Sequence, residues 1–135
     1  MLQAAESSTD HWHPKKLLIE TPFGSCIRSG HLLFVGGIDG FEPGRHLEPG
    51  DISEQARRAL NAMKGILESA GSSMDQVLKV QMSVAEPNRN LAVLNEIYRE
   101  FFPDIFPVRS YSGARTSQMG TEGLLCQLSC MAYVD

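Results

Sequence analysis

The sequence contains no hydrophobic run that approaches the roughly 20 residues of a membrane-spanning helix. It also has no excess of positive charge, because 12 lysines and arginines stand against 16 aspartates and glutamates, for a net charge of −4. No basic run offers the electrostatic footprint that nucleic-acid binding needs. We therefore expect no membrane partner and no nucleic-acid partner.

Cysteine is scarce, and the three cysteines lack the spacing of a metal site. An odd number favours free thiols in a reducing compartment, so we expect a cytoplasmic protein. Cys126 and Cys130 would share one face of a strand, but residues four apart are too distant to form a disulfide. His11 and His13 lie on a polar stretch and are weak evidence for a metal. We predict no metal and no cofactor.

The length of 135 residues and the hydrophobic content of 42% fit one globular domain with a real core. Residues 1–16 are polar and lack the apolar centre of a signal peptide. We predict that residues 1–16 form a flexible tail and that residues 17–135 form the single domain.

Glycines mark the boundaries of the first elements. Residues 32–35 form a short apolar run that is typical of a buried strand, and Gly36 and Gly37 indicate a bend or a close approach. A hairpin over about residues 24–37 should precede the first helix. Residues 38–50 carry several glycines and prolines, which predict a loop.

The first helix is predicted to begin at Asp51, which with Glu54 three residues later matches a capping box. Gly71 supplies the left-handed residue that ends it. Apolar residues recur at steps of three and four and should face the core: Ile52, Ala56, Ala59, Leu60, Met63, Leu67 and Ala70.

Residues 77–84 alternate well enough for a strand, and an apolar stripe over residues 91–101 predicts a second helix. Residues 124–134 form the closing strand, with Leu128 on one face and Gln127 on the other. Strands, helix, strand, helix and strands in this order predict an α+β fold, a two-layer structure in which two helices cover one face of a mixed β-sheet.

The most informative side chain is Arg109. Pro103 and Pro107 end the second helix, so Arg109 opens the next extended segment. An arginine at the mouth of a strand presents a planar, permanently charged group that suits a carboxylate. The alternative is a surface arginine in an ordinary ion pair.

Five segments stand in a characteristic order: Gly30–Gly37, Asp51–Leu60, Ile66–Val80, Asn95–Phe102 and Pro107–Ser110. In this order they resemble the reactive intermediate deaminase family, called Rid or YjgF. The resemblance extends from about Pro22 to the C-terminus. It implies a chorismate-mutase-like fold and a homotrimer with an active-site cleft at each subunit interface. It also implies a hydrolase that deaminates 2-imino or 2-enamino acids to keto acid and ammonia.

The resemblance assigns roles to particular positions. Arg109 matches the arginine that binds the substrate carboxylate, and the backbone at Gly36 and Gly37 would face the cleft. Gln127 falls where the family has the glutamate that orders the attacking water. A glutamine can orient water through its amide oxygen, but it cannot accept a proton as a base.

Three further positions depart from the family pattern. Phe23 replaces a tyrosine and lacks its hydroxyl, Gly36 replaces a serine, and Tyr111 stands where the family has a small or sulfur-bearing residue. These changes predict a pocket that is reshaped for another ligand, such as an aromatic or longer one.

Glu122 is a candidate replacement for the missing carboxylate, and Arg115 is a candidate holder of a second substrate carboxylate. For both residues the alternative is an exposed loop position. Asn95 and Tyr98 match the helix motif of the family. Because asparagine is a poor helix former, Asn95 should make a specific hydrogen bond, which we interpret as structural.

Three functions follow. The first is deamination of small reactive imines or enamines. The second is a pathway-specific deamination of a larger substrate, such as an aminomuconate. The third is non-catalytic binding of small carboxylate metabolites. RNA cleavage is the weakest option, because the chain is acidic and lacks a histidine acid–base pair.

Overall fold

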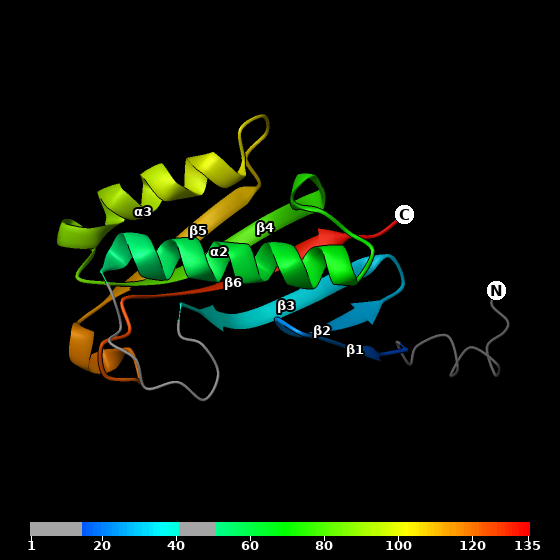
Figure 1. Ribbon diagram of the computed structural model, residues 1–135, viewed down its shortest axis with the longest axis horizontal. Coiled ribbons are helices and arrows are strands. Elements are labelled where there is room, and N and C mark those ends of the chain that lie inside the picture. The colour runs from blue at the N-terminus through cyan, green and yellow to red at the C-terminus, as the bar shows by residue number, and fades with distance from the viewer. Residues whose placement is uncertain (1–14, 41–50) are drawn as a thin grey trace, which may run out of the picture.

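The computed structural model describes residues 15–40 and 51–135. One six-stranded sheet has the order β1-β2-β3-β6-β4-β5, and both long helices lie on the same face of it (Figure 1). Only β4 and β5 run parallel, while every other neighbouring pair is antiparallel. The predicted α+β fold is confirmed. Residues 1–14 of the predicted tail and residues 41–50 of the predicted loop lie outside the described residues.

Strands β1 (Leu17–Thr21), β2 (Gly24–Ser29) and β3 (Leu32–Asp39) form an antiparallel series. The hairpin of β2 and β3 is as predicted, whereas β1 was not predicted. The loop prediction over 38–50 is wrong at its start, because β3 continues to Asp39. A bulge at Gly36 and Gly37, where Gly37 has a φ of 71°, lets the strand resume pairing with β6.

Helix α2 (Ile52–Ser69) begins as predicted, with the Asp51 carboxylate accepting a hydrogen bond from the Glu54 backbone N–H at 2.9 Å. The Glu54 carboxylate pairs with Arg58 at 3.2 Å rather than completing the capping box. Gly71, with a φ of 86°, follows the end of the helix and supplies the left-handed turn.

The second half of the domain is a strand–helix–strand crossover followed by the closing strand. Strand β4 (Val77–Ala85) leads to α3 (Pro87–Phe101), then to the parallel edge strand β5 (Val108–Ala114) and to β6 (Cys126–Tyr133). Two short 3-10 helices, η1 (Met74–Gln76) and η2 (Thr116–Gln118), lie in the connections.

The core lies between the sheet and the two helices. Alternate strand residues such as Val80, Met82 and Leu128 are buried against the helices, while Gln127 on the other face is exposed. Gln55 of α2 is also buried, and its amide bonds the Gly123 carbonyl and the Leu125 N–H, each at 2.8 Å. In the described part of the chain, no helix is long and apolar enough to cross a membrane.

Candidate functional site

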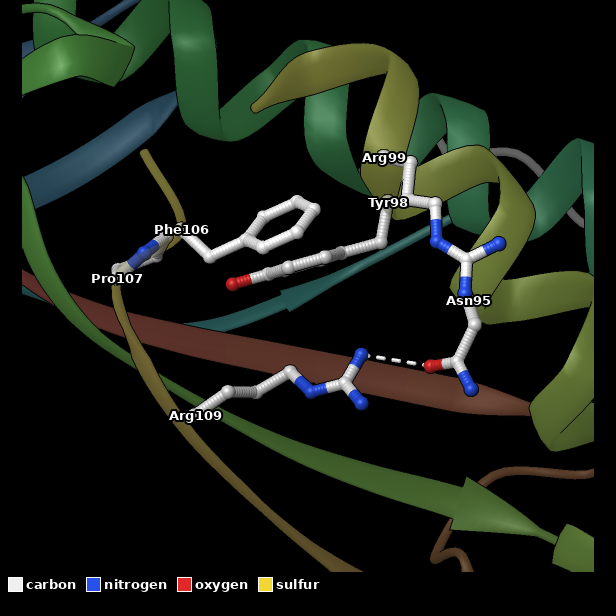
Figure 2. A pocket seen from close by; sticks show the side chains of 6 residues that line it. All are labelled: Asn95, Tyr98, Arg99, Phe106, Pro107 and Arg109. Atoms are coloured by element: carbon white, nitrogen blue, oxygen red, sulfur yellow. Dashed lines mark hydrogen bonds between the residues drawn. The ribbon is translucent and has the colours of Figure 1, made fainter. Parts of the chain in front are cut away.

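Arg109 lies near the start of β5 on the helix-covered side of the sheet. Its strand neighbour is Val80, which is fully buried beneath the helices, so the two side chains share that face. Figure 2 shows the Arg109 side chain extending from the strand toward α3. The prediction that Arg109 opens an extended segment is confirmed.

Two residues of α3 hold the guanidinium group in place. Arg109 Nη1 donates a hydrogen bond to Asn95 Oδ1 at 2.6 Å. The guanidinium carbon also lies 4.9 Å from the centre of the Tyr98 ring, within the range of a cation–π contact. Asn95 and Tyr98 are three residues apart and therefore project from one side of the helix. The hydrogen bond expected of Asn95 is confirmed, and its partner is the candidate carboxylate-binding residue.

These side chains border a pocket of about 200 Å³. Its lining comes from α3, from the segment before β5 and from β5 itself, and it contains no acidic residue among those described: Asn95, Tyr98, Arg99, Phe106, Pro107 and Arg109. A guanidinium has five N–H donors, and only one of those of Arg109 is used by Asn95. The remaining donors are available for a ligand anion.

Tyr98 lines this pocket and carries a buried hydroxyl group. The side chain is 3% exposed, and its hydroxyl has no hydrogen-bond partner within residues 15–40 and 51–135. Its ring lies 4.7 Å from the Phe102 ring and 6.2 Å from the Phe106 ring, measured between centres. Burial raises the pKa of Tyr98 to about 12, although the nearby Arg109 acts in the opposite direction. At neutral pH the hydroxyl is therefore a donor and not a base.

A second cleft, of about 680 Å³, contains three of the predicted binding residues, namely Phe23, Gly36 and Gly37. The cleft lies where β2 and β3 separate, since their pairing ends at Ile27 and Phe34. Arg58 of α2 also lines it.

The ring of Phe23 rests directly on α2. A Cβ atom built at Gly65 would come within 2.5 Å of this ring, so the close approach of Phe23 depends on the glycine. Phe23 is nevertheless 53% exposed, so much of its ring remains open to a ligand in the cleft.

Gln127 lies on the open face of the sheet, paired with Asp39 of β3 and Ser83 of β4. Its partner Asp39 lines the second cleft, but Gln127 itself is not among the lining residues. Arg109 is two strands away from Gln127, about 10 Å across the sheet at ordinary strand spacing, and it is offset by three residues along the strand and lies on the opposite face. A single chain does not bring Arg109 and Gln127 together.

The other predicted residues are dispersed. Tyr111 shares the Arg109 face of β5 through its pairing with Met82. Glu122 is exposed in a loop hollow of about 430 Å³, and the exposed Arg115 directly precedes η2 as its N-cap residue. Neither Glu122 nor Arg115 lines the Arg109 pocket.

Sequence reasoning missed Arg99 and Phe106 as residues of the Arg109 pocket, and it missed Arg58 as a residue of the second cleft. The position of Arg99 could have been predicted from spacing. Arg99 follows Asn95 by four residues, so the two side chains are neighbours on the same face of the helix. No comparable signal existed for Phe106, which depends on how the chain turns before β5.

All three cysteines are buried and free, as predicted. Burial raises the pKa of the Cys126 and Cys130 thiols to about 12, so neither is a nucleophile at neutral pH. Across the described ranges there is no group of three or more His, Cys, Asp or Glu side chains that could hold a metal ion.

Comparison with known proteins gives a consistent result. The sequence profile of the endoribonuclease L-PSP family (Ribonuc_L-PSP) matches residues 14–132. A RutC family protein from Pyrococcus horikoshii is 36% identical over 115 residues, which cover 84% of this chain and 88% of that protein. The 2-iminobutanoate/2-iminopropanoate deaminase of Homo sapiens is 30% identical over 90 residues, or 66% of this chain and 65% of that protein.

Among solved structures, a protein of unknown function from the Rid family of Yersinia pestis superimposes with a TM-score of 0.78. It is 28% identical in sequence, and the match covers 89% of this chain and 100% of that chain.

Proposed function

We propose that this chain, which belongs to the endoribonuclease L-PSP family, also called the YjgF/Rid family, is a hydrolase that deaminates 2-imino or 2-enamino acids. The products would be a 2-keto acid and ammonia. The observation that carries the proposal is the position of Arg109, whose guanidinium is held by Asn95 and Tyr98 beside a pocket without lining acids. Relatives that are named 2-iminobutanoate/2-iminopropanoate deaminases support this reaction class.

Arg109 binds the substrate carboxylate in this proposal. Two parallel N–H···O bonds from one guanidinium fix both the distance and the orientation of a carboxylate, which a lysine ammonium does less well. The bond to Asn95 and the contact with Tyr98 favour the rotamer in which the guanidinium borders the pocket. Binding therefore positions the adjacent C=N carbon for attack.

The reaction needs little base strength, because the imine nitrogen is itself basic and enters protonated. Water adds to the iminium carbon, the C–N bond breaks, and iminium plus water yields keto acid plus ammonium. Gln127 would orient the water through its amide oxygen, while protons pass between water and the departing nitrogen. The neutral Tyr98 hydroxyl is not part of this proton transfer.

A homotrimer would complete the site by bringing Arg109 of one subunit to Gln127 of the next. Support comes from the separation of these residues within one chain. Apolar side chains in one cross-strand row on the open face of the sheet provide further support: Leu18, Ile27, Phe34 and Met131, followed by Lys79 of β4 and then Val108. The free thiols agree with a cytoplasmic location.

Non-catalytic binding of a carboxylate metabolite is the second candidate. It is favoured by one specific observation, the amide of Gln127 in place of a carboxylate. Both candidates need Arg109 to bind an anion, and they differ only in whether ammonia is released.

Arg109→Ala and Arg109→Lys test the proposal. We expect Arg109→Ala to lower kcat/KM for freshly generated 2-iminobutyrate by about 100-fold or more, the scale at which a bidentate charged contact acts. Arg109→Lys should recover only part of this loss. Unchanged turnover in a folded Arg109→Ala protein would refute the assignment. Binding of 2-oxobutyrate by the wild type without ammonia release from any imine would select the non-catalytic candidate.

A further inference from the structure

The Arg109 pocket contains a second guanidinium group, that of Arg99, which the proposed reaction does not use. Arg99 follows Asn95 by one helical turn and is exposed at the surface of α3. Within the described ranges, neither Arg99 nor Arg109 forms an ion pair with an acidic side chain. Two positive charges that share one small pocket without a counter-ion favour an anionic occupant.

The two guanidinium groups approach Asn95 from different directions. Figure 2 shows Arg99 projecting from α3 and Arg109 extending from β5, where Arg109 reaches the Asn95 amide oxygen. The pocket is therefore lined by two cationic groups that come from two different elements. The rings of Tyr98 and Phe106 supply an apolar wall beside them.

The size of the pocket limits the ligand. A volume of about 200 Å³ is smaller than the roughly 300–1,000 Å³ of pockets that hold drug-sized ligands. A chain of four or five carbons with a carboxylate at each end suits both the charge and the volume.

We propose that the pocket selects 2-imino dicarboxylates of four or five carbons, with Arg109 binding the carboxylate next to the C=N bond and Arg99 binding the distal one. This inference rests on the proposed function for its reaction, but its anion selectivity is independent of turnover. In this inference the second substrate carboxylate is bound by Arg99. Arg115, the residue suggested for that role by the sequence, lies outside the pocket.

Binding of stable product analogues tests the selectivity without any turnover. Calorimetry on the wild-type protein should give at least tenfold tighter binding of 2-oxoglutarate than of 2-oxobutyrate. Arg99→Gln should reduce that ratio about tenfold. Arg89→Gln is the matched control, because Arg89 is an exposed arginine on the same helix outside the pocket, and this variant should keep the wild-type ratio.

Turnover of in situ generated 2-iminoglutarate and 2-iminobutyrate then separates the two claims. A kcat/KM ratio that falls in Arg99→Gln but not in Arg89→Gln supports the inference. Equal affinity for the two keto acids, or the same ratio in both variants, overturns it and leaves the deaminase proposal standing. A ratio that falls in Arg115→Gln instead also overturns it. Selective binding with no turnover of either imine would refute the deaminase proposal and retain the inference.

Discussion

The two faces of the sheet differ in how much of their apolar surface is buried within one chain. On the helix-covered face, Val80, Met82 and Leu128 are buried in a continuous core, and Arg109 stands at its edge beneath α3. On the open face, Phe34 and Val108 remain 41% and 70% exposed. The covered face is thus packed within one chain, whereas the open face exposes these apolar side chains beside polar ones such as Lys79 and Gln81. The homotrimer proposed above would cover this open face.

The largest effect should come from a charge placed on the open face. Phe34→Asp replaces an exposed apolar ring of this face by a carboxylate, and desolvating that carboxylate in an interface costs several kcal/mol. We expect a wild-type trimer in sedimentation and a Phe34→Asp monomer at micromolar concentration.

Phe34→Leu is the control for this variant, because it keeps the apolar surface and should remain trimeric. Circular dichroism should show that the aspartate variant keeps its sheet and helices. A wild-type monomer, or a trimer that tolerates the aspartate, would contradict the assembly through this face.

Neighbouring residues of β6 provide the second test, because Leu128 faces the helices and Ser129 faces away. Leu128 is 1% exposed, so Leu128→Ala should lower the free energy of unfolding by about 2–5 kcal/mol. Ser129→Ala should change it by less than about 0.5 kcal/mol. Urea unfolding at one fixed chain concentration makes the comparison, and equal losses would show that the two faces are packed alike.

A smaller effect is expected from Asn95→Ala, which leaves Arg109 charged but removes its hydrogen bond. A bond to a charged group contributes about 1.5–3 kcal/mol, so kcat/KM for 2-iminobutyrate should fall about tenfold or more. Asn88→Ala, an exposed change on the same helix, should leave kcat/KM unchanged. Equal activity in the two variants would mean that Asn95 does not position Arg109.

The sequence was sufficient for most of the fold because local signals and burial agreed. Asp51 and Gly71 bound α2 as their capping chemistry predicts, and the alternation of β6 places Leu128 inside and Gln127 outside. β1 was missed because it is short, and polar residues stand directly before and after its three apolar ones. The extension of β3 to Asp39 depends on a bulge, which restores register after two glycines that resemble the start of a loop.

The candidate site was only partly predictable, because it depends on how elements meet. The proline spacing located Arg109 correctly, and the poor helix propensity of Asn95 signalled a specific partner. Nothing in the local sequence showed that Gln127 would lie on the opposite face from Arg109, or that Arg115 and Glu122 would lie outside its pocket. Those relations follow from strand order, which local patterns do not specify.

The central claim is that the guanidinium of Arg109 binds the carboxylate of a small keto or imino acid. The most direct test is a crystal structure of the protein soaked with 2-oxobutyrate. We predict a carboxylate within hydrogen-bonding distance of Arg109, with Asn95 still holding Nη1 and Gln127 of a neighbouring subunit facing the keto carbon. A ligand bound elsewhere, with Arg109 contacting only Asn95 and Tyr98, would contradict the claim.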